Sequence, residues 1–233
     1  MMNNLKNKYC AVIVAGGSGT RMKTDVPKQF LMLGAKTVLA RSIEAFETSP
    51  FVDSIVVVAS ENYINDVKNA IKSFKKVTDI VPGGDTRQKS VYNGLAAVPE
   101  DCNCVLIHDG ARPLVDSGII KRCVLSLENG KNCAPGVKIK DTLKIADSFS
   151  KITKTPDREQ MYSIQTPQCF FTADILNAHN NAVSDAQITD DCMLMEAMGF
   201  DVYIVDGSYE NIKITTPEDL NLAEFILNKR GIL

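Results

Sequence analysis

A short apolar run that ends in closely spaced glycines constrains the fold of this chain most. Residues 9–15 are apolar and rich in β-branched side chains, which predicts a buried parallel strand. Gly16, Gly17 and Gly19 follow directly. Glycine adopts positive φ angles and lets a ligand approach the bare backbone, whose N–H groups can bind an anion. The sequence therefore predicts a strand followed by a ligand-binding turn.

Two cations follow the glycines at short range. Arg21 and Lys28 stand on the segment that leaves the turn, with Lys23 between them. A strand, a glycine turn and then basic side chains are a plausible way to hold a polyphosphate. The alternative is an ordinary glycine-rich turn that carries solvated basic residues.

The turn matches neither of two familiar phosphate motifs. The chain has no G-x-x-x-x-G-K-[ST] string, so it is not a P-loop protein. Gly17 and Gly19 begin a G-x-G-x-x-G dinucleotide fingerprint, but Met22 stands where its third glycine belongs. If this turn binds a nucleotide, it does so in another way.

Apolar runs alternate with amphipathic stretches through the first half of the chain. Strands are predicted at 9–15, 53–59, 77–81 and 104–107, and helices at 37–46, 61–74, 86–97 and from Asp116 or Ser117 to 127. Further along, helices are predicted at 173–182, 190–199 with Thr189 as cap, and 216–228, with extended pieces at 202–205 and 211–214. We therefore expect a single-domain α/β protein over residues 1–233, with a Rossmann-like, mostly parallel sheet covered by helices on both faces.

Composition excludes several classes of function. The 233 residues are 45% hydrophobic and carry a formal net charge of −2, which suits one globular domain and offers no basic field for nucleic acid. No apolar run approaches the roughly 20 residues of a membrane helix, and the first residues do not resemble a signal peptide. Seven scattered cysteines without a C-x-x-C pair indicate reduced thiols in a cytoplasmic protein.

Residues 137–158 break the alternation. Val137, Ile139, Leu143 and Ile145 lie on odd positions with polar residues between them, and a turn near 147 returns the chain. An isolated two-stranded hairpin is only marginally stable in water. We therefore predict a β-arm that packs against the same arm of a second subunit, giving a homodimer. The alternative is that the arm lies on its own domain.

The unusual residues of this chain lie where predicted strands end. Such ends are found at 16–28, at 83–90, at 109–112 and near Lys213. Ligands of open parallel sheets bind at the carboxyl ends of strands, so these segments can meet in one crevice. Their joint character is cationic and glycine-rich, with Asp85 and Asp109 as acids. This suits a nucleoside triphosphate with Mg²⁺ or another divalent cation, held mainly by the phosphates rather than by protein ligands.

The chain offers few candidates for a general base. Its only histidines are His108 and His179, and we interpret His108 as a structural residue at a strand end. An alcohol nucleophile needs a base, whereas a phosphate monoester, with a second pKa of about 6, is already ionised at pH 7. Catalysis would then consist of positioning and charge neutralisation.

Several strings together resemble the 2-C-methyl-D-erythritol 4-phosphate cytidylyltransferases of the non-mevalonate isoprenoid pathway. The strings are Ala15-Gly16-Gly17-Ser18-Gly19-Thr20-Arg21-Met22, Pro27-Lys28-Gln29-Phe30, Gly83-Gly84-Asp85-Thr86-Arg87 with Ser90, His108-Asp109-Gly110-Ala111-Arg112-Pro113, Val137-Lys138-Ile139-Lys140-Asp141-Thr142, Asp157-Arg158, Gln165-Thr166-Pro167-Gln168, Thr189-Asp190-Asp191, and Asn211-Ile212-Lys213 through Pro217. The resemblance spans residues 12–226 and implies a nucleotidyltransferase fold. It also implies a reaction in which the acceptor phosphate attacks the α-phosphorus of CTP and pyrophosphate leaves.

The resemblance also implies residue roles. Arg21, Lys28, Arg158 and Lys213 match catalytic residues. Nucleotide-binding positions are matched by Ala15, Gly16, Gly17, Gly19, Gly83, Gly84, Asp85, Ser90, Asp109 and Ala111. Acceptor-binding positions are matched by Arg112, Thr142, Arg158, Thr166, Thr189 and Lys213, with Thr142 and Arg158 acting on the partner subunit.

Three other functions remain open at this point. A ribitol 5-phosphate cytidylyltransferase shares the Gly-Gly-x-Gly-Thr-Arg form, but segments 137–142 and 157–158 look more like the methylerythritol enzymes. A non-catalytic nucleotide-binding module is disfavoured by Arg21, Lys28 and Lys213. A dehydrogenase is disfavoured by the broken glycine fingerprint.

Overall fold

A computed structural model describes residues 7–16, 27–182 and 188–233 of the chain. Gly17, Gly19 and Arg21, which the sequence analysis singled out, lie outside the described residues. The first half contains β1 (Tyr9–Ala15), η2 (Lys28–Phe30), β2 (Met32–Leu33), β3 (Lys36–Thr37), α1 (Val38–Glu47), β4 (Ser54–Ala59), η3 (Glu61–Tyr63), α2 (Ile64–Ile71), β5 (Val77–Pro82), α3 (Arg87–Leu95), β6 (Cys104–Asp109) and α4 (Ser117–Glu128). The second half contains β7 (Asn132–Lys138), β8 (Ile145–Ala146), β9 (Ile152–Lys154), η4 (Arg158–Gln160), β10 (Tyr162–Ile164), β11 (Gln168–Phe171), α5 (Thr172–Asn180), α6 (Asp191–Ala197), β12 (Val202–Asp206) and α7 (Pro217–Lys229).

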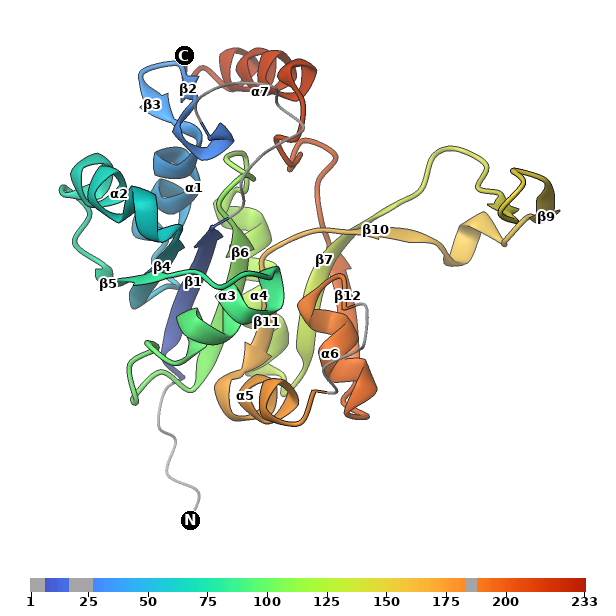
Figure 1. Cartoon of the computed structure of the whole chain (residues 1–233), viewed down its shortest axis with the longest axis horizontal. Helices are drawn as coiled ribbons and strands as arrows, with labels where there is room; N and C mark the ends of the chain where they lie inside the picture. Colours follow the sequence, from blue (N-terminus) through green and yellow to red (C-terminus); the bar gives the residue numbers. More distant parts are fainter. Residues whose placement is uncertain (1–6, 17–26, 183–187) are drawn as a thin grey trace.

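The central sheet confirms the predicted α/β fold. Its strand order is β10-β7-β11-β6-β1-β4-β5, with β12 beside β7 (Figure 1). The pairs of β1 with β4 and β6, of β4 with β5 and of β7 with β12 are parallel. The antiparallel pairs all involve β10 or β11. The sheet is therefore mostly parallel, with its antiparallel part on the side of β7.

Alternation along β1 builds a core on each face of the sheet. Ala11 and Ile13 pack into one cluster with α1, α2 and α4, whereas Cys10 and Val12 pack into another with α3, α5 and α6. Burial on both faces explains why the strand is almost wholly apolar. A smaller third cluster joins α7 to the β2–β3 hairpin.

The carboxyl ends of four parallel strands lie at one edge of the sheet. Ala15 is in register with Ala59, Ala59 with Pro82, and Val14 with Asp109. The chain runs from β1 outward through β4 to β5 and then returns to β6 on the other side of β1. The order of strands therefore reverses between β1 and β6, which is where open α/β sheets place their ligands.

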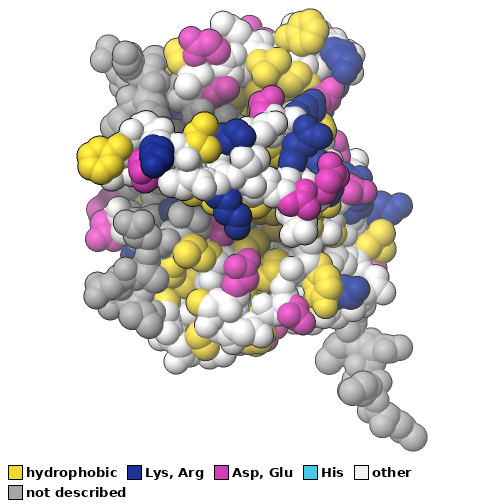
Figure 2. All heavy atoms as spheres, turned by 90° about the vertical axis from the view of Figure 1, so that its right-hand side faces the viewer, with side chains coloured by type: hydrophobic (Ala, Val, Ile, Leu, Met, Phe, Trp, Pro, Cys, Tyr) yellow, Lys and Arg dark blue, Asp and Glu magenta, His cyan; other side chains and the backbone are white. Residues whose placement is uncertain are grey.

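The arm, residues 137–158, extends away from the sheet (Figure 1). Its far part carries the two-stranded pair β8–β9, and its base continues β7 and leads into β10. The side chains of residues 140–155 are exposed, and Phe149 is 90% exposed. On the side of the molecule that the arm faces, Lys, Arg, Asp, Glu and hydrophobic side chains are intermingled rather than gathered by charge (Figure 2).

Some local expectations were wrong. Asp190, not Thr189, caps α6, because its carboxylate accepts a hydrogen bond from the Met193 N–H at 3.0 Å. Residues 211–214 form no regular strand, and the helix expected over 61–74 is divided into η3 and α2. Of the two residues predicted as the cap of α4, the structure confirms Asp116, whose carboxylate accepts a hydrogen bond from the Ile119 N–H. Among the described residues no helix is long and apolar enough to cross a membrane.

Candidate active site

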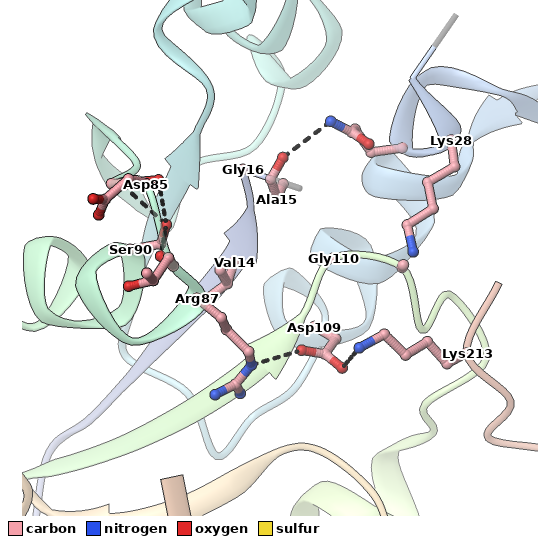
Figure 3. Close-up of a pocket in the computed structure, with 14 residues that line it drawn as sticks. Val14, Ala15, Gly16, Lys28, Asp85, Arg87, Ser90, Asp109, Gly110 and Lys213 are labelled. Atoms are coloured by element: carbon pink, nitrogen blue, oxygen red, sulfur yellow. Dashed lines mark hydrogen bonds and ion pairs between the residues drawn. The ribbon is translucent and has the colours of Figure 1, made fainter. Parts of the chain in front are cut away.

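A pocket of about 430 Å³ opens at the edge of the sheet where β1, β5 and β6 end. Nine predicted site residues line it: Ala15, Gly16, Lys28, Gly84, Asp85, Ser90, Asp109, Ala111 and Lys213. Residues from four segments that are distant in the sequence therefore meet in one cavity (Figure 3). The remaining described candidates do not line this pocket: Gly83, Arg112, Thr142, Arg158, Thr166 and Thr189.

Gly16 and Gly83, at the ends of β1 and β5, approach each other beside the pocket. A Cβ atom added to Gly16 would lie 3.5 Å from Ser90 Oγ and 3.9 Å from Gly83 Cα. A Cβ added to Gly83 would lie only 3.0 Å from the same Oγ. A side chain at Gly83 would therefore crowd Ser90, whereas a Cβ at Gly16 would make ordinary van der Waals contacts.

Ser90 holds the turn after β5 in shape. Its hydroxyl accepts a hydrogen bond from the Gly84 N–H at 3.0 Å and donates to the Thr86 carbonyl at 2.8 Å. The side chain is buried, so Ser90 acts on the backbone of the turn in this structure. The predicted contact with the nucleotide base stays a prediction.

Asp109 is the electrostatic centre of the site. The Lys213 ammonium lies 2.8 Å from one carboxylate oxygen, and Arg87 Nε lies 3.5 Å from the other (Figure 3). Arg112 Nε lies 3.7 Å from the oxygen that Lys213 contacts. Burial alone raises the pKa of the Asp109 carboxyl, but Lys213 and Arg87 outweigh it and hold that pKa well below its usual range. Asp109 is therefore ionised throughout the physiological range.

Arg87 is a functional candidate that the sequence roles left out. It forms a bidentate ion pair with Asp191, in which Nη1 and Nη2 lie 3.0 and 2.7 Å from the two carboxylate oxygens. It also reaches Asp109 and lines the pocket. Arg87 thus joins the turn after β5, the end of β6 and the start of α6. It stands in the matched string 83–87, but only the fold shows which carboxylates it meets.

His108 supports the site from behind. Its Nε2 lies 3.1 Å from the Arg112 carbonyl, which can only accept, so Nε2 carries the proton. Nδ1 then accepts from the Thr166 hydroxyl at 3.0 Å, and Thr166 Oγ1 accepts from the Asp109 N–H at 3.1 Å. Each of these three hydrogen bonds therefore has one defined donor and one defined acceptor, and the imidazole is neutral. Burial lowers the pKa of His108 to about 4.

Lys28 and Gln29 bring the segment after the glycine loop back to the sheet. Gln29 is buried and donates to the Ala15 carbonyl at 3.0 Å, which fixes η2 against the end of β1. Lys28 donates to the Ile214 carbonyl at 3.0 Å, and its ammonium lies at the pocket (Figure 3). Lys28 and Lys213 therefore lie on the same side of the cavity as Gly110.

The acceptor candidates fall into two groups. Thr166 and Arg112 lie directly behind the pocket, where Arg112 Nη1 donates to the Asn211 carbonyl at 2.9 Å. Thr142 and Arg158 belong to the arm and are exposed, with Arg158 Nη1 donating to the Lys140 carbonyl at 3.0 Å. Thr189 is also exposed.

We predict that Arg87→Gln lowers the free energy of unfolding by about 3 kcal/mol, because it leaves the Asp191 carboxylate buried without its partner. In urea titrations, the double variant Arg87→Gln with Asp191→Asn should lose less than the sum of the two single losses. Lys229→Gln, which breaks an exposed pair with Glu210, is the matched control and should cost at most about 1 kcal/mol. Additive losses at 87 and 191 would show that the pair is not coupled.

A second prediction concerns acid. Between pH 6.5, the ordinary pKa of histidine, and the folded value of about 4, the unfolded chain binds a proton at residue 108 that the folded chain does not. Stability from this residue is thus complete above about pH 6.5 and falls as the pH drops, by about 3 kcal/mol at pH 4. Urea titrations of wild type and His108→Asn across this range should diverge by that amount. Parallel curves would contradict a neutral, buried His108.

Comparison with known proteins agrees with the resemblance seen in the sequence. A profile of the family "2-C-methyl-D-erythritol 4-phosphate cytidylyltransferase" matches residues 9–229. A protein of that name from Clostridium acetobutylicum is 48% identical over 229 residues, covering 96% of this chain and 99% of its own. One from Alkaliphilus oremlandii is 43% identical over 233 residues, with 98% of each chain covered.

Solved structures are similar over the same range. The crystal structure of 4-diphosphocytidyl-2C-methyl-D-erythritol synthase from Anaerococcus prevotii superposes with a TM-score of 0.85 at 31% identity. The match covers 95% of this chain and 96% of that one.

Proposed function

The chain belongs to the 2-C-methyl-D-erythritol 4-phosphate cytidylyltransferase family, and from this membership and the pocket we propose that it transfers CMP from CTP to 2-C-methyl-D-erythritol 4-phosphate. The products are 4-diphosphocytidyl-2-C-methyl-D-erythritol and pyrophosphate. The observation that carries the proposal is the convergence of glycine turns, lysines and the Asp109 ion pairs at the ends of β1, β5 and β6. Ribitol 5-phosphate is the alternative acceptor, and the relatives reported above do not favour it.

The nucleotide half of the pocket suits CTP. Gly16, Gly83 and Gly84 leave the backbone open to a flat base, and the Asp85 carboxylate and the Ser90-braced turn lie beside them. Asp109 and Ala111 lie at the end of β6, where a ribose would reach them. Ala15 lies at the end of β1, and Gly17 and Gly19, which follow it in the sequence, complete the proposed nucleotide site.

Charge neutralisation falls to cations on both sides of the triphosphate. Lys28 and Lys213 come from distant segments and line the same cavity, and Arg21 is proposed to join them from the glycine loop. As the acceptor phosphate approaches the α-phosphorus in line, negative charge gathers there. Preorganised ammonium and guanidinium groups stabilise this charge without reorganising.

The reaction needs no general base. At pH 7 the acceptor phosphate is ionised and is itself the nucleophile. His108 is buried and holds its proton toward the Arg112 carbonyl, so it cannot take one from a substrate. The two features agree, because a phosphate attacker makes a proton acceptor unnecessary.

Mg²⁺ fits the donor set as a substrate-held ion. It requires oxygen ligands and commonly takes one or two carboxylates together with phosphates and waters. Asp109 supplies one ionised carboxylate at the pocket, and its oxygen nearest Arg87 is 3.5 Å from that cation. The phosphates of CTP would hold most of the ion, Asp109 would offer one carboxylate to it, and the ion would neutralise phosphate charge.

The arm supports a proposal of homodimerisation. Its tip exposes Ile145, Phe149 and Ile152, and a lone hairpin of this kind is marginally stable. Arg158 and Thr142 lie on the arm and not at the pocket of their own chain. We propose that Arg112, Thr166, Thr189 and Lys213 bind the acceptor together with these two residues of a partner subunit.

Seven free cysteines support a cytoplasmic protein.

Parallel assays of pyrophosphate release test the function. With CTP and Mg²⁺, we expect turnover with 2-C-methyl-D-erythritol 4-phosphate and little with ribitol 5-phosphate. ATP and UTP serve as controls for the base. Equal or faster turnover with ribitol 5-phosphate would reassign the acceptor, and no turnover with either would remove the proposal.

Lys28→Ala and Arg21→Ala should each lower kcat by roughly 10²–10³, the usual cost of losing one preorganised donor or charge. Lys131→Ala removes an exposed lysine that stacks on Tyr203 away from the pocket, and it should leave kcat unchanged. Thermal unfolding of each variant checks that the fold is intact. Wild-type turnover in both variants would exclude the catalytic roles.

Mixing two inactive variants tests the shared site. Arg158→Ala damages the arm, and Lys28→Ala damages the pocket. If arms act across the dimer, dissociating and reassociating the two variants should restore part of the activity, because one site of each mixed dimer is intact. Mixing Lys28→Ala with Lys213→Ala should restore none. Failure of the first mixture, or a monomer by sedimentation, would contradict the arm proposal.

A further inference from the structure

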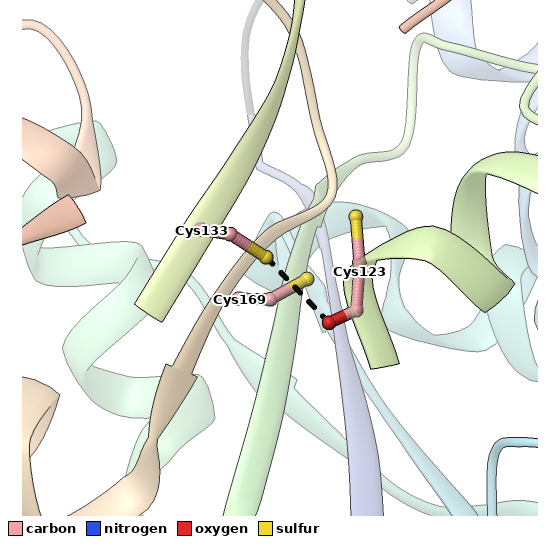
Figure 4. A group of neighbouring side chains, drawn as sticks. All are labelled: Cys123, Cys133 and Cys169. Atoms are coloured by element: carbon pink, nitrogen blue, oxygen red, sulfur yellow. Dashed lines mark hydrogen bonds between the residues drawn. The ribbon is translucent and has the colours of Figure 1, made fainter. Parts of the chain in front are cut away.

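Three cysteine thiols meet in the core on the side of the sheet covered by α4. Cys123 lies on α4, Cys133 on β7 and Cys169 on β11, and their sulfur atoms all lie within 4.8 Å of one another (Figure 4). All three residues are buried with essentially no exposed surface. They are far apart in the sequence, and the sheet brings them together.

The backbone fixes the geometry of this cluster. Cys133 and Cys169 are directly opposite each other where β7 and β11 pair. Cys123 and Cys169 both direct their thiols toward the Pro167 carbonyl, at 3.9 and 3.4 Å, and Cys133 directs its thiol toward the Cys123 carbonyl at 3.6 Å. These contacts are long and weak, so the sulfur lone pairs remain available as ligands.

The spacing suits a three-coordinate ion. With bonds of about 2.3 Å to each sulfur, as in zinc thiolates, three sulfurs around one centre lie about 4 Å apart. Within the described residues the cluster contains no fourth His, Cys, Asp or Glu ligand. Zn²⁺, which takes four ligands in structural sites, is therefore a poor fit.

The net charge of the complex further limits which ion or metalloid the three thiolates can bind. Three thiolates around a monovalent or divalent ion leave net negative charge in an apolar, water-free core, which is costly. A trivalent centre gives a neutral complex.

We propose that Cys123, Cys133 and Cys169 form a binding site for a trivalent thiophilic metalloid, with arsenous acid as its ligand. Arsenous acid is small and uncharged at pH 7. Three As–O bonds and three S–H bonds break, three As–S bonds form, and the protons leave with the hydroxyl groups as three waters. No electrons are transferred, so neither an oxidant nor a reductant is required. Because the thiols are buried, binding follows the opening of the core and is slow.

Intact-protein mass spectrometry tests the proposal on the full chain. Protein incubated with sodium arsenite and a phosphine reductant, then desalted, should gain one arsenic and lose three hydrogens. A two-thiol adduct, such as one on the neighbouring Cys10 and Cys102, would lose only two hydrogens and keep one hydroxyl. Wild type that gives no adduct, or only the two-hydrogen form, overturns the proposal.

Variants locate the site. Cys123→Ala, Cys133→Ala and Cys169→Ala should each abolish the three-hydrogen adduct, whereas Cys104→Ala, a buried cysteine outside the cluster, should retain it. Arsenite should raise the melting temperature of wild type and of Cys104→Ala but not of the cluster variants, because a ligand stabilises the state that binds it. Retention of the adduct in any cluster variant overturns the assignment.

A spectroscopic measurement on wild type makes the test independent of variant folding. X-ray absorption at the arsenic edge should find three sulfur neighbours and no oxygen. An oxygen neighbour would overturn the three-thiol site even if no cluster variant folds. Neither readout depends on cytidylyl transfer, so this proposal and the proposed function can fail separately.

Discussion

The site depends on one buried carboxylate, that of Asp109, which is surrounded by more positive charge than its own negative charge can balance. Asp109 lies within ion-pair distance of Lys213, Arg87 and Arg112, and Arg87 is shared with Asp191. Removing a carboxylate from water is costly unless it is paired and hydrogen-bonded. Here the pairing exceeds what neutrality requires, and the surplus faces the cavity together with Lys28. A polyanion that binds in the cavity would neutralise this surplus positive charge.

Hydrogen bonds behind the pocket hold this carboxylate in place. The Asp109 N–H donates to Thr166, Thr166 donates to His108, and His108 donates to the Arg112 carbonyl. These hydrogen bonds connect the two ends of the loop after β6, Asp109 and Arg112, through Thr166, which lies just before β11. The same segment supplies Gln168, which donates to Asp190 and accepts from the Asp191 N–H. The two carboxylates that Arg87 joins are therefore positioned by one short stretch of chain, and Arg87 bridges parts that are already fixed.

The sequence predicted the parts of this arrangement that local chemistry determines. The β-branched runs identified β1, β4 and β6, and the rule that ligands bind at the carboxyl ends of parallel strands gathered Lys28, Ser90, Asp109 and Lys213 correctly. It missed the strand at Asn132–Lys138, because Pro135 and Gly136 have low strand propensity and only pairing with neighbouring strands holds them there. It also missed β11, a four-residue strand directly after Pro167. The partners of Arg87 could not be predicted, since Asp191 is 104 residues away and nothing local specifies that contact.

Strand β11, on the antiparallel side of the sheet, contacts both the ion-pair network and the cysteine cluster of the core. Gln168 on β11 contacts Asp190 and Asp191, while Cys169, the next residue, faces Cys123 and Cys133 in the core. Successive residues of a strand point to opposite sides, so one short strand contacts both environments. His108 is neutral, fully buried and bonded at both nitrogens, so it has no free position from which to give a proton to an ionised phosphate or to take one from it. Under the proposed function, the cations at the pocket would therefore meet a nucleophile that is already ionised.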